Sequence, residues 1–319
     1  MSPPVVAVSR QVPFPGVDPL RQAAFDVRYR DVDSPCPHQE LARLVAPAAG
    51  LLCLLSEQVD AALLDAAPNL RIVANMAVGF DNIDVDACSE RGVVVTNTPD
   101  VLTDATADLT WALILAVARR IGEGERLLRC RTWAGWRPAE LLGVGLNAKT
   151  LGIIGMGKIG SAVARRAAGF DMDVVYHNRR PVPGAAASYV SFHELLARSD
   201  VVVLNAPFTA ETRHLIDGAA LAVMKDSALL INTARGPLVD EAALVDALRN
   251  RVIAGAGLDV YEQEPKVHPG LFELDNVVLL PHLGSATHEA RGAMVQLACD
   301  NLVAVLSGDR PLTPITSLR

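Results

Sequence analysis

The 319-residue sequence has no apolar run long enough to cross a bilayer, which takes about 20 residues. It also lacks a basic start followed by an apolar stretch, so we expect no signal peptide. Its net charge of −7 gives no indication of a general affinity for nucleic acid or an anionic membrane. These absences predict a cytoplasmic protein with neither of those partners.

Cysteine is scarce, and the five cysteines form no C-x-x-C pair; they stand at positions 36, 53, 88, 130 and 299. A zinc site needs clustered ligands and a disulfide framework needs paired cysteines, so we expect neither. Reduced thiols fit the expected cytoplasmic location, and we predict no metal site.

Half of the residues are hydrophobic, which is enough for two cores in a chain of this length. Short β-branched runs alternate with helical patterns, and this alternation predicts parallel sheets covered by helices on both faces. The first series of expected strands is 5–8, 50–55, 72–74 and 93–95, with helices at 38–45 and 56–67. The second series of strands is 150–154, 173–176, 201–204, 228–232, 253–258 and 277–280, with helices at 159–169, 191–198 and 241–250.

Two longer helices are also expected. One runs unbroken over 103–129, with Asp104 and Asp108 near its start and Arg126 near its end, an order that suits the helix dipole. The other, at 287–307, is rich in apolar residues and is predicted to pack back on the first series of strands. The alternative for this last helix is a place beside the second series.

A glycine loop follows the strand expected at 150–154 and opens the next helix. It reads Gly155-Met156-Gly157-Lys158-Ile159-Gly160 and matches G-x-G-x-x-G, a pattern that the strand before it and the helix after it make far more specific. The glycines allow a tight turn, close approach of a pyrophosphate, and close helix–strand packing, in that order. Because unpaired N–H groups at the helix start would face the phosphates, we predict a dinucleotide site. A glycine turn without a ligand is the alternative.

The acid that usually binds the ribose of NAD, about 20 residues after the loop, is absent. Asn178 falls in its place, and Arg179 and Arg180 follow, whose guanidinium groups suit a 2′-phosphate. The missing acid therefore favours NADP(H). NAD(H) stays open as the alternative, because arginine is common in this chain and the two arginines can be ordinary loop residues.

Reactive side chains follow three later strands, where a turn alone would suffice: Arg235, the pair Glu262 and Glu264, and His282. Ligands of open parallel sheets bind at the carboxyl ends of the strands. Reduction of a 2-keto acid needs a cation for the carboxylate and an acid for the developing alkoxide, which arginine and histidine supply. A carboxylate beside the histidine would stabilise its protonated form and orient it.

Together these motifs resemble the D-isomer-specific 2-hydroxyacid dehydrogenase family, and within it the glyoxylate/hydroxypyruvate reductases. The resemblance extends over nearly the whole chain, through the segments 77–87, 93–120, 151–160, 231–248, 255–265 and 281–291. It implies two Rossmann-like or flavodoxin-like α/β domains with the active site in the cleft between them. Residues 1–98 and 287–319 would form a discontinuous substrate domain, residues 99–286 an inserted NAD(P)-binding domain, and the 103–129 region a homodimer.

The resemblance also implies roles for single residues. It assigns catalysis to Arg235, Glu264 and His282, while Glu262 fits the motif less well. The implied substrate contacts are Arg235, His282, Leu55, the N–H groups of Val78 and Gly79, and Trp136 of a neighbouring subunit. An interface or core position is the alternative for this tryptophan. Besides the glycine loop and residues 178–180, the implied cofactor contacts are Thr106, Pro207, Thr212, Thr233, Ala234 and Asp259, the last at the nicotinamide carboxamide.

We therefore predict an NADPH-preferring reductase of glyoxylate and hydroxypyruvate that uses His282 as its acid/base. A reductase of a bulkier keto acid, such as hydroxyphenylpyruvate or 2-ketogluconate, is the alternative because pocket size does not show in a sequence. Phosphoglycerate dehydrogenases usually keep the acid for NAD, and formate dehydrogenases generally carry glutamine at the position of Glu264. A cofactor-gated, corepressor-like binding protein shares the fold, but the chain shows no long tail for such a role.

Overall fold

A computed structural model describes residues 3–315 of the chain. The chain divides into two compact units. Unit 1 consists of Met1–Leu102 and Ala286–Arg319, and unit 2 of Thr103–Ser285. Each unit contains one sheet with parallel strand pairs only, so both are α/β units, as the alternation of strand and helix patterns predicts.

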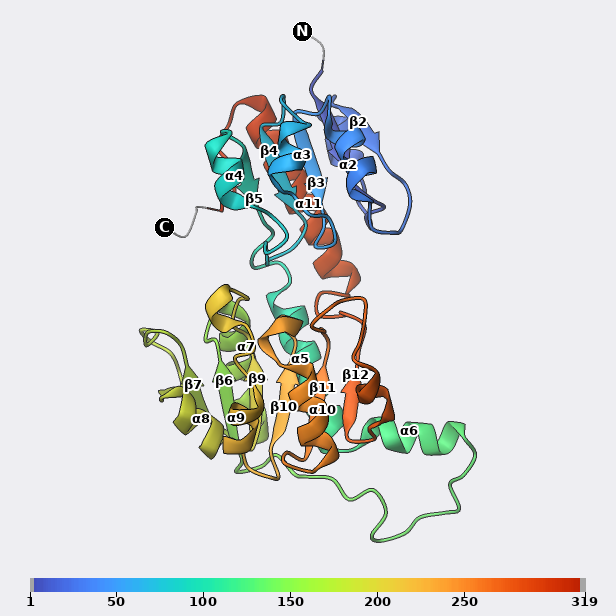
Figure 1. The fold of residues 1–319 in the computed structure, drawn as a ribbon, viewed down its shortest axis with the longest axis vertical. Helices are drawn as coiled ribbons and strands as arrows, with labels where there is room; N and C mark the ends of the chain where they lie inside the picture. Colours follow the sequence, from blue (N-terminus) through green and yellow to red (C-terminus); the bar gives the residue numbers. More distant parts are fainter. Residues whose placement is uncertain (1–2, 316–319) are drawn as a thin grey trace. The chain divides into compact units, whose positions relative to one another are not determined.

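Unit 1 is built on a five-stranded sheet with the order β2-β1-β3-β4-β5, an arrangement of the flavodoxin type. Its strands are β1 (Val5–Val8), β2 (Asp26–Tyr29), β3 (Gly50–Cys53), β4 (Ile72–Asn75) and β5 (Val94–Thr96). Its helices are α1 (Asp18–Gln22), α2 (His38–Val45), α3 (Ala61–Asp65), α4 (Val85–Glu90) and α11 (His288–Ser307). Helix α11 packs on β3, β4 and α1, so the end of the chain completes the unit that its beginning starts (Figure 1).

Unit 2 is built on a seven-stranded sheet with the order β12-β11-β10-β9-β6-β7-β8. Its strands are β6 (Thr150–Ile154), β7 (Asp173–His177), β8 (Ser188–Tyr189), β9 (Val201–Leu204), β10 (Leu229–Asn232), β11 (Gly255–Leu258) and β12 (Val277–Leu279). Its helices are α5 (Thr103–Ala118), α6 (Ile121–Arg129), α7 (Lys158–Ala167), α8 (Phe192–Arg198), α9 (Gly218–Val223) and α10 (Glu241–Arg249). The direction of winding reverses between β6 and β9, as in doubly wound dinucleotide-binding folds.

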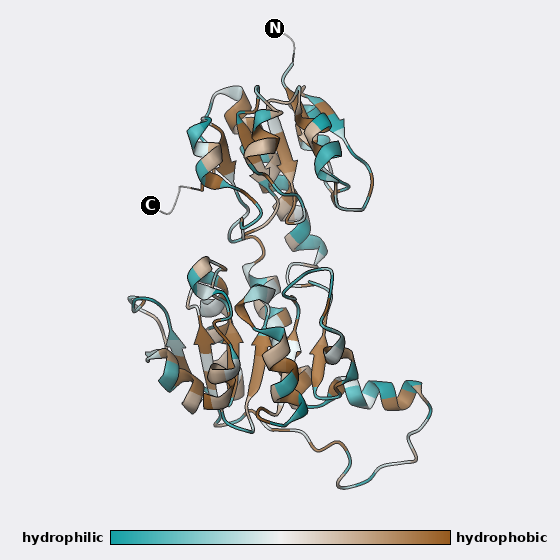
Figure 2. Cartoon of the chain, viewed as in Figure 1, coloured by the Kyte–Doolittle hydropathy of each residue, from teal (hydrophilic) through white to brown (hydrophobic). Residues whose placement is uncertain are grey.

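Successive residues of the unit 2 strands point to opposite faces of the sheet, and each face has its own hydrophobic core. Leu230 belongs to one core and Ile231 to the other, and both are fully buried. Burial of each such side chain contributes about 1.5–3 kcal/mol. Figure 2 shows the result as largely hydrophobic strands with helices of mixed hydropathy around them.

The unbroken helix expected over 103–129 is wrong. Helix α5 ends at Ala118 and α6 begins at Ile121, because Arg120 between them has a left-handed φ of 52°. The guanidinium group of Arg120 donates two hydrogen bonds to Glu123, at 2.8 and 2.6 Å. The N–H of Val144 donates to the carbonyl of Ala118 (2.8 Å), so a distant segment closes the end of α5.

Strand β3 is shorter than expected, and so is the helix after it. Residues 54–57 form a turn, in which the N–H of Glu57 donates to Leu54 O (3.3 Å) and the N–H of Leu54 donates to Glu57 Oε2 (2.8 Å). The short strands β2 and β8 were not predicted. The other expected strands and helices agree with the structure to within two residues at each end.

No helix among residues 3–315 combines the length and apolar character needed to cross a membrane. Within the same range, no cluster of three histidine, cysteine or acidic residues is arranged to hold a metal ion.

Candidate active site

The glycine loop of unit 2 lies where the winding of the sheet reverses. It leaves β6 at Gly155, whose φ of 100° and close approach to the backbone of Asn205 leave no room for a side chain. A Cβ on Gly160 would overlap the carbonyl oxygen of Gly155, so this glycine lets α7 pack against the loop. Gly157 begins α7 without a side-chain cap, and a Cβ there would meet open space. An uncapped helix start facing open space fits a dinucleotide pyrophosphate.

Asn178 lies directly after β7 and holds the glycine loop. Its Oδ1 accepts a hydrogen bond from the N–H of Met156 at 2.6 Å, so the asparagine shapes the loop as well as standing where an acid is usual. Arg179 and Arg180 are both exposed. Lys158 and Ile159 form the first turn of α7.

His282 and Glu264 form a direct pair in unit 2. The Nδ1 of His282 lies 2.8 Å from Oε2 of Glu264, and both side chains are about one-third exposed. The other oxygen, Oε1, accepts the N–H of Tyr261 at 3.1 Å. Burial acts to raise the pKa of Glu264, but its hydrogen bond to His282 and the nearby positive charges outweigh burial and lower it. The carboxylate is therefore ionised near neutral pH and suited to orient the imidazole.

Asp259 holds the loop that carries His282. It is fully buried, and its two carboxylate oxygens accept the N–H groups of Leu283 (2.6 Å) and Gly284 (2.8 Å). Its backbone carbonyl accepts the N–H of His282 (2.9 Å). Burial raises the pKa of Asp259, against the lowering effect of these N–H bonds. The structure thus gives Asp259 a role in holding this loop, and its contact with a nicotinamide carboxamide stays a prediction.

Arg235 follows β10 in a turn that Asn232 holds. The Asn232 side chain donates to Arg235 O (2.8 Å) and accepts from the N–H of Ala234 (3.0 Å). A Cβ on Gly236 would overlap the backbone of Tyr261, so this turn packs directly against the segment that leads to Glu264. The positive charge of Arg235 accordingly contributes to lowering the pKa of Glu264, after the larger effects of burial and His282.

The neighbouring Glu262 is engaged elsewhere. Its Oε1 lies 2.7 Å from Nε2 of His214 and 3.1 Å from the guanidinium group of Arg213. Its backbone N–H donates to the buried Glu241 at 2.6 Å. Of the two glutamates that the sequence offers, the structure therefore pairs Glu264, and not Glu262, with His282.

The other predicted cofactor contacts of unit 2 lie around these loops. Thr212 accepts the N–H of Thr209 and donates to Pro207 O (3.0 Å), so it closes the loop after β9. Thr233 is joined to α5 by a 2.8 Å hydrogen bond to Thr110. Thr106 is buried and would contact a side chain added at Gly284, which places it beside the His282 loop.

The predicted substrate contacts of unit 1 lie on two loops after neighbouring strands. Leu55 is half-buried in the turn after β3, and Val78 and Gly79 are half-buried after β4. Within residues 3–315, no acceptor binds the backbone N–H groups of Val78 and Gly79. Two adjacent unpaired N–H groups suit an anion such as a carboxylate.

Trp136 lies on the long loop after α6, which projects away from the sheet of unit 2 (Figure 1). Its side chain is 81% exposed, so the alternative of a core tryptophan is wrong.

A cavity of about 300 Å³ lies between the end of α5 and the residues before β11 and β12, and no predicted site residue lines it. It borders the amino-terminal edge of the sheet, opposite the carboxyl ends that carry the candidate site.

A doubly wound sheet with an open glycine loop, and with arginine and a histidine–glutamate pair at its carboxyl edge, defines a nicotinamide-dependent oxidoreductase. Residues 111–284 match the family model described as D-isomer specific 2-hydroxyacid dehydrogenase, NAD binding domain. The glyoxylate reductase of Thermococcus litoralis is 48% identical over 316 residues, which cover 97% of this chain and 95% of the relative. The chain belongs to the D-isomer specific 2-hydroxyacid dehydrogenase family and is an NAD(P)-dependent enzyme.

Solved structures with similar folds support the same family. The TT0316 protein of Thermus thermophilus superposes with a TM-score of 0.94 at 45% identity, covering 98% of this chain and all of that chain. The NADPH-dependent glyoxylate/hydroxypyruvate reductase of Sinorhizobium meliloti, in complex with NADP and malonate, has a TM-score of 0.88 at 37% identity and covers 99% and 97% of the two chains.

Substitution by alanine should have different effects at Gly157 and at Gly160. Gly157→Ala leaves the fold intact, because the added Cβ meets only open space, but it lowers nucleotide affinity about tenfold or more by occupying the phosphate approach. Gly160→Ala lowers the melting temperature instead, because its Cβ overlaps the Gly155 carbonyl. Thermal melts and nucleotide titrations distinguish the two; unchanged nucleotide affinity in Gly157→Ala would contradict the site.

Proposed function

We propose that this enzyme is an NADPH-preferring reductase of small 2-keto acids, glyoxylate and hydroxypyruvate, which it converts to 2-hydroxy acids of the D series. The observation that carries the proposal is the 2.8 Å His282–Glu264 pair beside the charge of Arg235, in a chain that is similar to named glyoxylate reductases over nearly its whole length. An arginine for the substrate's carboxylate and a histidine for its carbonyl oxygen are what this reaction needs.

The residues then divide the work as follows. Arg235 binds the carboxylate of the keto acid through its guanidinium group, and the N–H groups of Val78 and Gly79 bind the same group. The bound nicotinamide supplies the hydride to C2 of the substrate. Protonated His282 donates its proton from Nε2 to the carbonyl oxygen, because Nδ1 is engaged by Glu264. Glu264 stabilises the imidazolium form before this transfer and fixes the ring during it.

The cofactor preference rests on the end of β7. No acidic side chain stands there, Asn178 binds the glycine loop, and Arg179 and Arg180 are exposed and accessible to a 2′-phosphate. The two arginines would donate charge-assisted hydrogen bonds to the 2′-phosphate of NADPH. NADH would find no acidic side chain to bind its ribose hydroxyls.

The direct test is the oxidation of NADPH, and separately of NADH, with glyoxylate and then hydroxypyruvate. Turnover that favours NADPH supports both the reaction and the cofactor preference. Turnover that favours NADH keeps the reaction and refutes the reading of residues 178–180. Failure with both acids, followed by turnover of hydroxyphenylpyruvate or 2-ketogluconate, would assign the enzyme to a bulkier substrate.

The His282→Ala variant should lose about 10²–10⁴-fold in kcat, because it removes a positioned proton donor. The keto-acid reduction rate at saturating NADPH measures this. The matched control is His38→Ala, which removes a histidine that also pairs with a carboxylate, Asp60 at 3.1 Å, but in unit 1. Near-normal turnover in His282→Ala would refute the acid/base assignment.

Replacing Arg179 and Arg180 together by alanine should lower kcat/KM for NADPH about 10–100-fold and leave that for NADH nearly unchanged. Arg198→Ala is the control, since Arg198 is an exposed arginine that pairs with Glu194 on α8. Equal losses for the two nucleotides would show that the arginines do not bind the 2′-phosphate.

We further propose that the enzyme is a homodimer, with an interface on α6 and the loop after it. Helix α5, the other half of the 103–129 region, is largely used inside unit 2; its Trp111, for example, stacks on Phe170 with ring centroids 4.3 Å apart. Exposed large apolar side chains gather instead along the α6 segment: Ile121, Leu128, Trp133, Trp136 and Leu142. Such a group is typical of a protein–protein interface.

Light scattering should therefore give about twice the 33.9 kDa chain mass for the wild type. The double substitution Leu128→Glu and Trp133→Glu should give the monomer mass, because two charges would be buried in the interface. Phe272→Glu, which changes an exposed apolar residue of unit 2 outside the α6 segment, should leave the dimer intact. A wild type that is monomeric at micromolar concentration would refute the proposal.

A further inference from the structure

Three successive carbonyl groups in the loop after β4 are held by different partners. The N–H of Thr98 donates to Ala77 O at 2.8 Å. The side-chain amide of Asn97 donates to Val78 O at 2.8 Å, and that of Asn75 donates to Gly79 O at 2.9 Å. Two of the three carbonyl groups are therefore held by asparagine side chains and one by a backbone N–H.

The direction of a carbonyl decides the direction of the next N–H. In a planar trans peptide the C=O and the N–H of one peptide group point opposite ways. The bond from Thr98 to Ala77 O therefore turns the N–H of Val78 away from Thr98, and the bond from Asn97 to Val78 O turns the N–H of Gly79 away from Asn97. Neither of these two N–H groups binds an acceptor within residues 3–315.

Asn97 is itself rigidly placed. Its backbone N–H donates to Thr313 O (3.3 Å), and its carbonyl accepts the hydroxyl of Thr313 (2.6 Å), in the segment that follows α11. Its amide is thus presented to Val78 from a fixed position at the end of β5.

Asn75 and Asn82 extend this hydrogen-bond network to the Leu55 turn. The buried Asn75 donates to Oδ1 of Asn82 (3.3 Å), and the Asn82 amide donates to Leu54 O (3.0 Å) and Glu57 O (2.9 Å). Both hydrogens of each side-chain amide are therefore used. The two loops cannot shift independently without leaving a buried amide unpaired, which costs about 1–3 kcal/mol.

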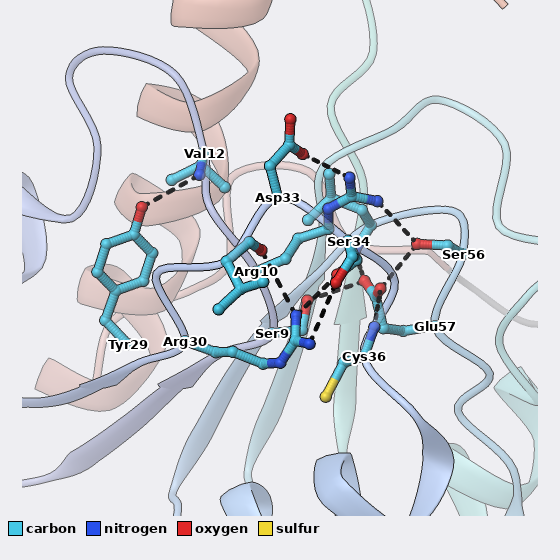
Figure 3. A network of polar contacts seen from close by, with 12 residues as sticks. Ser9, Arg10, Val12, Tyr29, Arg30, Asp33, Ser34, Cys36, Ser56 and Glu57 are labelled. Carbon is cyan, nitrogen blue, oxygen red and sulfur yellow. Dashed lines mark hydrogen bonds and ion pairs between the residues drawn. The ribbon is translucent and has the colours of Figure 1, made fainter.

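The far side of the turn is held by Glu57, which is 1% exposed (Figure 3). Its Oε2 accepts the hydroxyl of Ser9 (2.8 Å) as well as the N–H of Leu54, and its Oε1 accepts the hydroxyl of Ser56 (2.7 Å) and the N–H of Cys36 (3.3 Å). Ser9 follows β1 and the turn follows β3, so this carboxylate joins the strands between which the winding of unit 1 reverses.

We propose that Asn97 is a positioning residue for the substrate's carboxylate. It does not touch the substrate; it aims the N–H of Gly79, while the Asn75–Asn82 pair keeps the Leu55 turn in a fixed relation to that N–H. The inference rests on the proposed function, in which Val78 and Gly79 bind the carboxylate of a keto acid. It adds the residues that orient those N–H groups and link them to the residue lining the substrate's side chain.

Two variants test the role. Asn97→Ala removes the donor, and Asn97→Asp removes it without changing the size of the side chain. In both, KM for glyoxylate and the inhibition constant of oxalate should rise about tenfold, because a misdirected N–H loses a hydrogen bond to a charged group. The kcat should stay within about twofold and KM for NADPH should be unchanged, since neither depends on the direction of this N–H.

Asn276→Ala is the matched control. Asn276 is also half-buried, and its amide also donates to backbone carbonyls, those of Leu248 (3.2 Å) and Ala254 (3.1 Å), but at the amino-terminal edge of unit 2. It should lower the melting temperature without moving KM for glyoxylate. A purely structural role of Asn97 would produce the same pattern in its own variants and would overturn the proposal, as would loss of the fold in both Asn97 variants.

The proposed function can fail separately. If the wild type turns over no glyoxylate, that function is refuted, and the positioning role is measured as oxalate affinity of the NADPH complex by calorimetry. Weaker oxalate binding in Asn97→Asp than in the wild type and Asn276→Ala would support it. Equal affinity in all three, or no oxalate binding to the wild type, would overturn it.

Discussion

A loop that leaves the end of a parallel strand loses the ladder partners of its backbone groups, and a buried backbone group without a partner is costly. In this protein, buried side chains supply those partners. Asp259 accepts two N–H groups of the His282 loop, Asn232 holds the turn that carries Arg235, and Asn75 holds the carbonyl of Gly79. The same bonds that satisfy the backbone also aim the side chains and N–H groups of the candidate site.

The pairing in the candidate site follows from close packing as well as from polar bonds. Because Gly236 has no side chain, the turn after β10 lies against the backbone of Tyr261, and this contact brings the charge of Arg235 toward Glu264. Glu262, two residues earlier, binds His214 instead. One loop thus delivers two glutamates to two different histidines, and only Glu264 is paired with the histidine on the loop after β12.

Each unit places its distinctive loop where the winding of its sheet reverses. In unit 2 this is the glycine loop after β6, which Asn178 holds from the neighbouring strand β7. In unit 1 it is the Leu55 turn after β3, which Glu57 joins to the end of β1. Where the winding reverses, the two neighbouring strands are continued by connections on opposite faces of the sheet. Their carboxyl ends are therefore left uncovered, and a ligand or a polar side chain can enter there. Open space lies in front of the glycine loop, whereas the carboxylate of Glu57 lies against the Leu55 turn.

Much of this could be predicted from the sequence. The period of the apolar residues predicted both parallel sheets, and G-x-G-x-x-G between a strand and a helix predicted the turn from β6 into α7, because these features depend on neighbours along the chain. The binding of a dinucleotide by this loop stays a prediction. Arg235, Glu262, Glu264 and His282 were singled out because polar residues at strand ends stand out against apolar runs, and the catalytic roles of Arg235, Glu264 and His282 stay predictions. The break at Arg120 was missed, since Thr103–Arg129 contains no proline and the left-handed residue is an arginine rather than a glycine.

What only the tertiary structure decided is which polar groups meet. Spacing alone could not tell that Glu262 binds His214, that Asp259 accepts two backbone N–H groups of the His282 loop, or that the side chain of Asn97 donates to Val78, 19 positions earlier. A hydrogen bond between distant segments depends on how strands are ordered and how closely loops pack, and neither leaves a periodic mark in the sequence. The sequence by itself determined the elements and the kinds of reactive group; the packing of the strand ends determined their partners.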